Sequence, residues 1–367
     1  MYITRVSRCV SRGTAATMRA WVAQSAEDPP QLMTVPLPVL TKPDQVLVKV
    51  KAASVNPVDT LMVKGYGKEI LGTWKRVADF DVSANRFPLI PGRDCAGVVE
   101  SVAAGVKGLS PGDEVIAVVP AIWQGSHAEY VVTSEACCSR KPSNLDFSQA
   151  ASMPYVANTN WAALVSVARM DPYKKPVERV LIHGGSGGMG TMCIQMLKAW
   201  GTEKVVATCS KDSAEMVKKL GAIPIDYRAE DVRDRLIAEG PFEVILDCVD
   251  TDLAKWSDNI MSVWKNSVHV SVVSPLMRDT DRYGILPGLA TSATKYLCRS
   301  LQSAQRGRWF SYAYFMPNHA CMAQLTKFAE EGKIVPMVEK VFSFEELPAA
   351  YEKVSALHGR GKTVLKW

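Results

Sequence analysis

Glu178–Lys198, with the sequence ERVLIHGGSGGMGTMCIQMLK, is the stretch that decides the fold of the second half of the chain. Its first residues predict a short apolar strand, and Gly185, Gly187 and Gly190 then fit the pattern G-x-G-x-x-G. The apolar residues that follow predict a buried helix: Met192, Ile194, Met196 and Leu197. The order strand, glycines, helix predicts a dinucleotide-binding site, with a purely structural glycine turn as the alternative.

Each glycine of the pattern has an expected role. We expect Gly185 to permit the tight turn, Gly187 to let a pyrophosphate approach the backbone, and Gly190 to let the helix pack closely on the strand. The free N–H groups at the start of the helix then stabilise an anion without any basic side chain.

The type of dinucleotide depends on the next predicted strand, Lys204–Thr208, which is followed by Cys209, Ser210 and Lys211. An NAD site usually has Asp or Glu at the end of this strand to bind the ribose 2′-hydroxyl. Ser210 and Lys211 instead favour a 2′-phosphate, and therefore NADPH. The alternative is that Lys211 is a solvated residue and Asp212 a helix N-cap.

Composition indicates a globular protein with room for two domains, since 47% of the 367 residues are hydrophobic and 22% are charged. The nine cysteines include no C-x-x-C pair, which argues against a disulfide framework and favours a reducing compartment. A formal net charge of +6 gives no reason to expect nucleic acid as a partner.

The first 26 residues contain no acidic residue and carry Arg5, Arg8, Arg12 and Arg19. The arginines and the apolar residues lie on different faces of a helix, so we expect residues 1–17 to be a mitochondrial targeting segment, with a disordered basic tail as the alternative. No stretch approaches the roughly 20 apolar residues of a membrane span, which favours the mitochondrial matrix over an integral membrane location.

The remaining chain divides by its pattern into a β-rich part and a part in which strands and helices alternate. The strands predicted in the β-rich part are Met18–Ala23, Val46–Val55, Cys95–Val102, Glu114–Val119 and His127–Thr133. Those predicted in the alternating part are Arg179–Ile182, Lys204–Thr208, Ile223–Tyr227, Glu243–Asp247 and Val268–Val273. Alternation predicts a parallel sheet, and after a strand at Trp309–Phe315 the closing strands are expected to return to the first part.

Several separated motifs resemble the medium-chain dehydrogenase/reductases. They are Gly97–Val102, Gly112–Val115, His127–Tyr130 and the glycine loop, while Ser54–Asp59 looks like the quinone oxidoreductase branch. The resemblance implies an α/β fold with a GroES-like β-barrel domain at 18–150 and 317–367. It also implies a Rossmann domain with a doubly wound parallel sheet, which binds NADPH, at 151–316.

One departure from the zinc-dependent members of that superfamily concerns the metal. Asn56 stands where they have a zinc-binding Cys, and Gly92-Arg93-Asp94 replaces their Gly-His-Glu. Without these thiolate and imidazole ligands we expect no metal site, and hydride transfer to an acceptor that is already electrophilic, such as a quinone.

The resemblance also implies which residues contact NADPH. It carries over to Ser186, Gly188 and Met189 in the loop, to Ser210 and Lys211, to Tyr227 after the third strand, and to Tyr314, Phe315 and Met316 beside the nicotinamide. Core packing is the alternative for Phe315 and Met316. Gly361 and Lys362 match the family's C-terminal cofactor-facing stretch only weakly.

Two residues are candidates for catalysis. Tyr66 occupies a position similar to the tyrosine that protonates substrate in related 2-enoyl thioester reductases, or else it only lines the cleft. Asn56 is expected to hydrogen-bond substrate or ribose, although an Asn-Pro turn with Asp59 binding backbone amides explains it equally well. For His127 a structural hydrogen bond is the preferred interpretation.

The sequence thus predicts a mitochondrial NADPH-dependent oxidoreductase that reduces a quinone-type acceptor without zinc, and the resemblance links it to ubiquinone metabolism. Reduction of a 2-enoyl thioester or alkenal is the second enzymatic reading. A third reading is a low-turnover NADPH-binding scaffold for a reticulon-like membrane protein or a ubiquinone-biosynthesis protein. A homodimer is expected by resemblance only.

Overall fold

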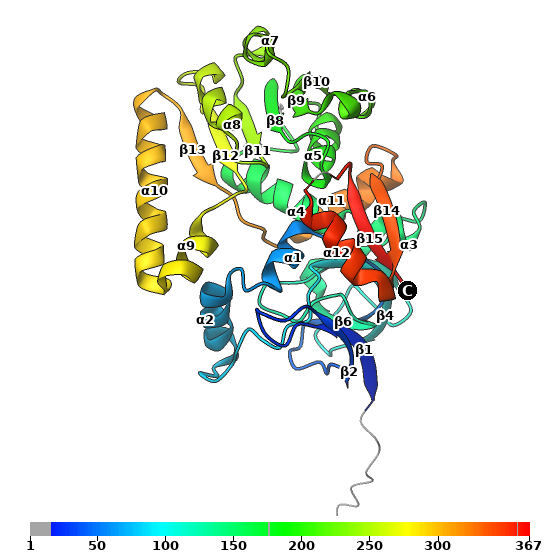
Figure 1. Cartoon of the computed structure of the whole chain (residues 1–367). Helices are drawn as coiled ribbons and strands as arrows, with labels where there is room; N and C mark the ends of the chain where they lie inside the picture. The colour runs from blue at the N-terminus through cyan, green and yellow to red at the C-terminus, as the bar shows by residue number, and fades with distance from the viewer. Residues whose placement is uncertain (1–15, 175–176, 358) are drawn as a thin grey trace, which may run out of the picture.

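The computed structural model describes residues 16–174, 177–357 and 359–367. Two large sheets lie one above the other in Figure 1, with helices between them and around them. Most of the predicted targeting segment lies outside the described residues, and the first strand already begins at Thr17. Among the described helices, none is both long enough and apolar enough to cross a membrane.

The upper sheet is built from six parallel strands in the order β10-β9-β8-β11-β12-β13. These strands are β8 (Arg179–His183), β9 (Lys204–Cys209), β10 (Ile223–Asp226), β11 (Val244–Asp247), β12 (Val268–Ser271) and β13 (Trp309–Tyr312). Because β8 has β9 on one side and β11 on the other, the strand order reverses there, which is the mark of the doubly wound Rossmann fold. This part of the fold prediction is confirmed.

The lower sheet has the order β14-β15-β3-β4-β5-β7, and β6 also pairs with β3. Its members are β3 (Gln45–Val55), β4 (Asp94–Val102), β5 (Glu114–Val118), β6 (Tyr130–Ser134), β7 (Cys138–Arg140), β14 (Val338–Ser343) and β15 (Lys362–Lys366), beside a hairpin of β1 (Thr17–Val22) and β2 (Gln31–Pro36). Since β15 pairs antiparallel with β3, the end of the chain lies in the sheet formed by its beginning. The domain boundaries at 150/151 and 316/317 stay a prediction.

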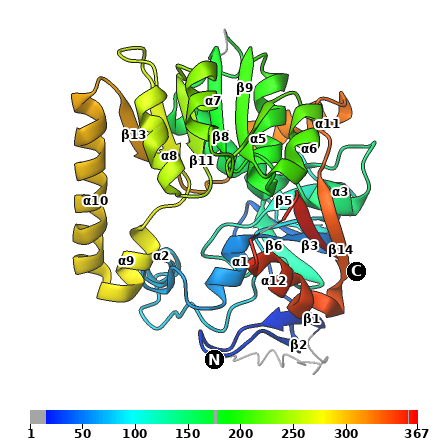
Figure 2. The ribbon, with the colours of Figure 1, turned by 45° about the horizontal axis from the view of Figure 1, so that its top comes forward.

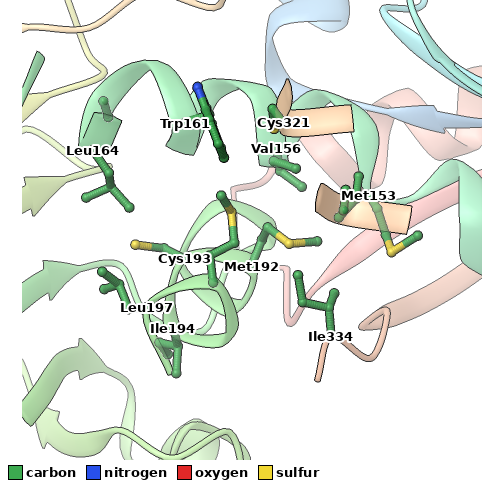
Figure 3. Packing of buried hydrophobic residues seen from close by; sticks show 14 of the residues in the cluster. Met153, Val156, Trp161, Leu164, Met192, Cys193, Ile194, Leu197, Cys321 and Ile334 are labelled. Atoms are coloured by element: carbon green, nitrogen blue, oxygen red, sulfur yellow. The ribbon is translucent and has the colours of Figure 1, made fainter. Parts of the chain in front are cut away.

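One apolar core joins the two sheets. Helix α4 (Pro154–Trp161) packs against α5 (Gly188–Ala199), and Figure 3 shows the side chains of Trp161 and Met192 within this contact. Core residues of both sheets, such as Ala96 and Ile182, belong to the same cluster. The start of α5 is therefore fixed relative to the lower sheet by packing.

The remaining helices complete the molecule. Helix α2 (Lys68–Asp79) follows α1 (Pro57–Met62) and contacts α9 (Leu276–Tyr283). Helix α10 (Ile285–Gln305) stands at the outer edge of the molecule beside β13 in both views (Figures 1 and 2). The other α-helices of the described chain are α3 (Phe147–Ala151), α6 (Ala214–Lys219), α7 (Val232–Glu239), α8 (Asp252–Trp256), α11 (His319–Glu330) and α12 (Leu347–Ser355).

Candidate functional site

The turn after β8 brings the loop close to β9. Gly184 has a φ of 89°, so the left-handed residue of the turn is Gly184 and not Gly185. Gly185 is required for a different reason, because a Cβ there would lie 2.5 Å from the Cβ of Ala207. Its N–H donates to the Thr208 carbonyl at 2.8 Å. The sequence analysis therefore placed the tight turn one residue too far along the chain, at Gly185 instead of Gly184.

The last glycine of the pattern matches its expected packing role. A Cβ at Gly190 would lie 2.3 Å from the Gly184 carbonyl oxygen and 2.6 Å from the Gly185 Cα. These are backbone atoms that cannot move aside easily, so only glycine lets α5 start this close to the turn.

Gly187, the N-cap of α5, has no such protein neighbour. Its φ of −75° suits any residue, and the nearest atom to a Cβ there is the Gly184 oxygen at 3.7 Å. Neither backbone strain nor packing accounts for glycine at this position. The helix end also lacks a side-chain cap, so its first N–H groups are available to an anion. A pyrophosphate lying against the backbone fits both observations.

The C-terminal segment lies against the same loop. The Gly361 N–H donates to the Ser186 carbonyl at 3.1 Å, and Gly187 and Gly361 form a short parallel bridge. The stem of Lys362 packs beside Gly188, where a Cβ would lie 2.6 Å from the Lys362 Cδ. The buried Nζ of Lys362 donates a hydrogen bond to the Oδ1 of Asn56.

Asn56 lies at the centre of a buried polar cluster and is 1% exposed. Its Nδ2 donates to the Oδ1 of Asp94 at 3.0 Å and to the Oδ2 of Asp59 at 3.2 Å. Asp59 also accepts from the Asn56 N–H at 2.8 Å, as the Asn-Pro turn interpretation expects. The polar atoms of Asn56 thus bind protein groups, and its catalytic role stays a prediction.

The charges of this cluster balance. Burial raises the pKa of Asp59 and Asp94 and lowers the pKa of Arg93 and Lys362, while the opposite charges counteract each shift. The Nε of Arg93 lies 4.0 Å from the Oδ1 of Asp59. Two cations therefore face two carboxylates in a space closed to solvent.

Arg93 donates from Nη1 to the carbonyls of Pro120 and Trp123 at 2.9 and 3.0 Å. Within residues 16–174, 177–357 and 359–367, no group of three or more His, Cys, Asp and Glu side chains is arranged to hold a metal ion.

His127, which precedes β6, is buried and lies within hydrogen-bond distance of two protein groups. Its Nδ1 lies 3.1 Å from the Tyr351 hydroxyl and its Nε2 lies 3.1 Å from the Ser54 carbonyl. Burial lowers the pKa of His127 to about 4, so the ring is neutral at physiological pH.

The carboxyl ends of β9 and β10 bring the predicted 2′-phosphate residues together. The Tyr227 N–H donates to the Cys209 carbonyl at 3.2 Å, and Ser210 precedes the short turn that begins with Lys211. The structure adds Arg360, whose Nη2 lies 3.6 Å from the Oδ2 of Asp212. Sequence reasoning did not assign Arg360 to the 2′-phosphate, because it lies about 150 residues after Lys211, although it directly precedes Gly361 and Lys362 of the expected cofactor-facing stretch.

The residues predicted beside the nicotinamide form the loop that follows β13. The Tyr314 hydroxyl lies 2.7 Å from the Oγ of Ser274, and Met316 is 64% exposed. Phe315 stacks on Tyr155 with ring centroids 4.6 Å apart, and it also packs against the main core. Phe315 thus has the core contacts that the alternative reading expected.

Tyr66 lies close enough to this loop for Tyr314 to influence its ionisation, in an apolar cluster with Met62, Leu71 and Leu89. Burial raises the pKa of Tyr66, with Arg278 opposing and Asp281 and Tyr314 reinforcing the shift. Asp281 also accepts hydrogen bonds from the N–H groups of Gly67 at 2.6 Å and Glu69 at 3.2 Å. The turn after Tyr66 is therefore attached to α9 on the Rossmann side.

Comparisons with known proteins agree with this architecture. Residues 42–143 match the family model described as alcohol dehydrogenase GroES-like domain, and residues 220–365 match the one described as zinc-binding dehydrogenase. The GroES-like part of the fold prediction is thereby confirmed.

Two relatives and one solved structure match over nearly the whole chain. The chain is 60% identical to mitochondrial reticulon-4-interacting protein 1 of Caenorhabditis elegans over 96% of each protein. It is 38% identical to the human mitochondrial NAD(P)H oxidoreductase RTN4IP1, over 99% of this chain and 92% of the relative. The quinone oxidoreductase of Coxiella burnetii superimposes with a TM-score of 0.75 at 26% identity, over 96% of this chain and 100% of that one.

The contrast between Gly187 and Gly190 gives a first prediction. We expect Gly187→Ala to fold with an unchanged melting temperature and to bind dinucleotide at least about tenfold more weakly, because the methyl group occupies only the ligand's space. Gly190→Ala serves as the matched variant and should lower the melting temperature. Calorimetric titration and thermal melts measure both; unchanged dinucleotide affinity in Gly187→Ala would contradict the assignment.

Proposed function

We propose that this chain is an NADPH-dependent reductase of quinone-type acceptors. The premise is that the chain belongs to the medium-chain dehydrogenase/reductase superfamily and, within it, to the RTN4IP1 family of oxidoreductases. In this proposal the enzyme works without zinc in the mitochondrial matrix and serves ubiquinone metabolism. The observation that carries it is the open backbone cradle at Gly187, at the start of α5 and beside the C-terminal segment that leads into the lower sheet.

The names of the similar proteins support the location and the acceptor. The relatives from Caenorhabditis elegans and human are named mitochondrial, and the human one is named an NAD(P)H oxidoreductase. The bacterial structure is named a quinone oxidoreductase. The arginine-rich first residues of this chain agree with a mitochondrial destination.

The preference for NADPH rests on charge at the end of β9. Lys211 and Arg360 supply two cations there, and Ser210 supplies a hydroxyl donor. Arg360 gives up its exposed pairing with Asp212 easily, because surface ion pairs contribute little free energy. Tyr227 is placed beside these groups to stack and to donate to phosphate.

The chain's own residues bind and orient both reactants. The glycine loop and the first N–H groups of α5 hold the pyrophosphate, and Ser186, Gly188 and Met189 line that approach. Tyr314, Phe315 and Met316 form the wall beside the ring, which Phe315 stiffens by stacking on Tyr155. A bound reduced nicotinamide would supply the hydride.

Reduction of a quinone to a hydroquinone consumes one hydride and one proton, and Tyr66 is the proton donor in this proposal. The hydride adds to the acceptor, the resulting oxyanion takes the proton of the Tyr66 hydroxyl, and the phenolate recovers a proton from solvent. The raised pKa of Tyr66 keeps the hydroxyl protonated through the neutral range. Asn56 acts indirectly: it accepts a hydrogen bond from Lys362 and so holds the Lys362 side chain against the glycine loop.

A quinone does not need a Lewis acid, and the cluster around Asn56 agrees with that. By the family resemblance, Asn56 and Arg93 stand near the positions of zinc ligands; Lys362 donates to Asn56, and the charges of Arg93 and Lys362 oppose a further cation there. Zinc prefers thiolate, imidazole and carboxylate ligands, and both carboxylates here already face those cations.

Tyr66 also keeps a second reaction open, the reduction of a 2-enoyl thioester or alkenal. Such a reaction needs a proton donor near the site of hydride addition, and Tyr66 lies within electrostatic reach of Tyr314 beside the proposed nicotinamide position. The third hypothesis is a low-turnover scaffold for a reticulon-like or ubiquinone-biosynthesis partner, and the name of the nematode relative supports only the reticulon-like partner.

We also propose a homodimer formed through α10. This helix turns Leu286, Leu297 and Leu301 outward, with exposed fractions of 79%, 55% and 61%, beside the edge strand β13. Exposed apolar stripes of this kind are typical of protein interfaces. We expect light scattering to give twice the mass of one chain and Leu297→Glu to halve it; a monomeric wild-type protein would contradict the dimer.

The cofactor preference is tested at Lys211 and Arg360. We expect Lys211→Ala and Arg360→Ala each to raise the KM for NADPH about tenfold, because each removes a charged hydrogen bond to the 2′-phosphate. The KM for NADH should stay unchanged, and Lys219→Ala on α6 is a matched control. Equal rises for the two dinucleotides would refute the assignment.

The proton donor is tested with Tyr66→Phe. We expect kcat for an enal or enoyl thioester to fall about a hundredfold, in line with the loss of a general acid. For the wild type the rate should decline only above pH ~10, since burial raises the pKa of Tyr66 above its ordinary value. If Tyr66→Phe retained the full rate with every acceptor, Tyr66 would only line the cleft and would not be the proton donor.

A further inference from the structure

A second concave site lies away from the glycine loop. A cavity of about 370 Å³ opens between α10, the segment that follows β11, and the residues that precede β13. Arg308, part of its lining, comes directly before β13, whereas the glycine loop comes directly after β8. In a parallel sheet these are opposite ends, so the cavity is separate from the dinucleotide site.

The lining is strongly basic. Five cations contribute to it, namely Lys255, Lys295, Arg299, Arg306 and Arg308, against the single carboxylate of Asp258. The sequence explains the imbalance, because the chain carries no Asp or Glu between Asp281 and Glu330. Positive charge concentrated in a hollow of this kind attracts anions.

Nearby carboxylates outside the lining neutralise only the two lysines at the rim of the cavity. Lys295 binds Asp279 at 2.7 Å and Lys255 lies 3.4 Å from Asp250. Both lysine side chains are about half exposed, whereas the side chain of Arg299 is 17% exposed and lies deeper. Arg299 is therefore the cation of the lining that most needs a counter-charge, whereas Arg306 is exposed to solvent.

The one carboxylate of the lining is already engaged. The Oδ1 of Asp258 lies 2.5 Å from the Nδ1 of His269. Burial disfavours a charged imidazole, but the nearby carboxylates of Asp247 and Asp258 outweigh it and raise the pKa of His269. The Asp258 carboxylate is thus engaged by His269, and its Oδ2 lies 4.0 Å from the Nη2 of Arg299.

Buried arginine atoms next to the cavity lack partners. Among the described residues, the Nη2 of Arg299 and the Nε of Arg308 are buried without a hydrogen bond. The Arg299 guanidinium stacks on Phe310 at 3.8 Å from the ring centroid, which fixes its plane. Burial lowers the pKa of Arg308, Asp258 opposes this shift, and the nearby positive charge of Arg306 adds to it.

We propose that this cavity binds a phosphate group, carried by a small soluble molecule or by a lipid headgroup. Guanidinium groups present paired N–H donors that match phosphate oxygens, and a dianion relieves the repulsion between Arg306 and Arg308. The volume admits a pyrophosphate or the phosphorylated end of a larger molecule. The site does not depend on the proposed reaction.

Cys298 provides a local probe, because it lines the cavity and is exposed, whereas seven other described cysteines are buried or half-buried. With NADPH present to occupy the glycine loop, we expect pyrophosphate to slow alkylation of Cys298, measured by mass spectrometry of its peptide. Arg306→Glu should weaken this protection about tenfold or more. Arg235→Glu on the exposed side of α7 is the matched control and should leave it unchanged.

A parallel measurement separates the two sources of phosphate. Protection by pyrophosphate alone assigns a soluble ligand, and protection by phosphatidylcholine vesicles only when they contain phosphatidic acid assigns a lipid headgroup. Absence of protection by either, or equal protection in Arg306→Glu, overturns the proposal. All arms use one fixed protein concentration and the Leu297→Glu background, because the dimer proposed through α10 would bring a second copy beside Cys298. NADPH binding to Arg306→Glu reports separately on the glycine loop.

Discussion

The contact on which the site depends is made by Lys362. Its stem lies beside Gly188 in the glycine loop and its ammonium group binds Asn56 in the lower sheet, so a single buried side chain joins the two halves. The preceding N–H of Gly361 binds the Ser186 carbonyl and adds a backbone link at the same place. The start of α5 is thus fixed by the last strand of the chain. A buried cation requires buried anions, and Asp59 and Asp94 balance Lys362 and Arg93; an uncompensated charge left by loss of one partner would cost several kcal/mol, on the order of 3–5.

Local patterns predicted the fold well wherever strands and glycines carry strong signals. The parallel strands and the packing role of Gly190 follow from short-range apolar patterns and from the glycine motif, and the return of the closing strands to the first part of the chain was also expected. Helix α10 gave no such signal, because its apolar residues point outward and its charged residues face the cavity. Because this arrangement reverses the usual amphipathic pattern, the helix can be recognised only in the folded structure.

Part of the candidate site was also predictable from local sequence patterns. Ser210, Lys211 and Tyr227 follow strands that lie side by side, so their meeting could be inferred from strand order. Arg360 comes from the far end of the chain, directly before Gly361 and Lys362; the register of β15 against β3, which sets its position, does not follow from any spacing rule. The left-handed turn at Gly184 was misplaced because two adjacent glycines offer the same freedom and only the approach to Ala207 distinguishes them.

The central claim is that this chain moves a hydride from a phosphorylated pyridine nucleotide to a quinone without a metal ion. Absorbance of reduced nicotinamide, followed with purified protein, a short-chain quinone and a strong chelator, tests it most directly. The account predicts NADPH oxidation at a rate that the chelator does not change, with NADH consumed more slowly. Oxidation that stops in the chelator and returns on addition of zinc would contradict it.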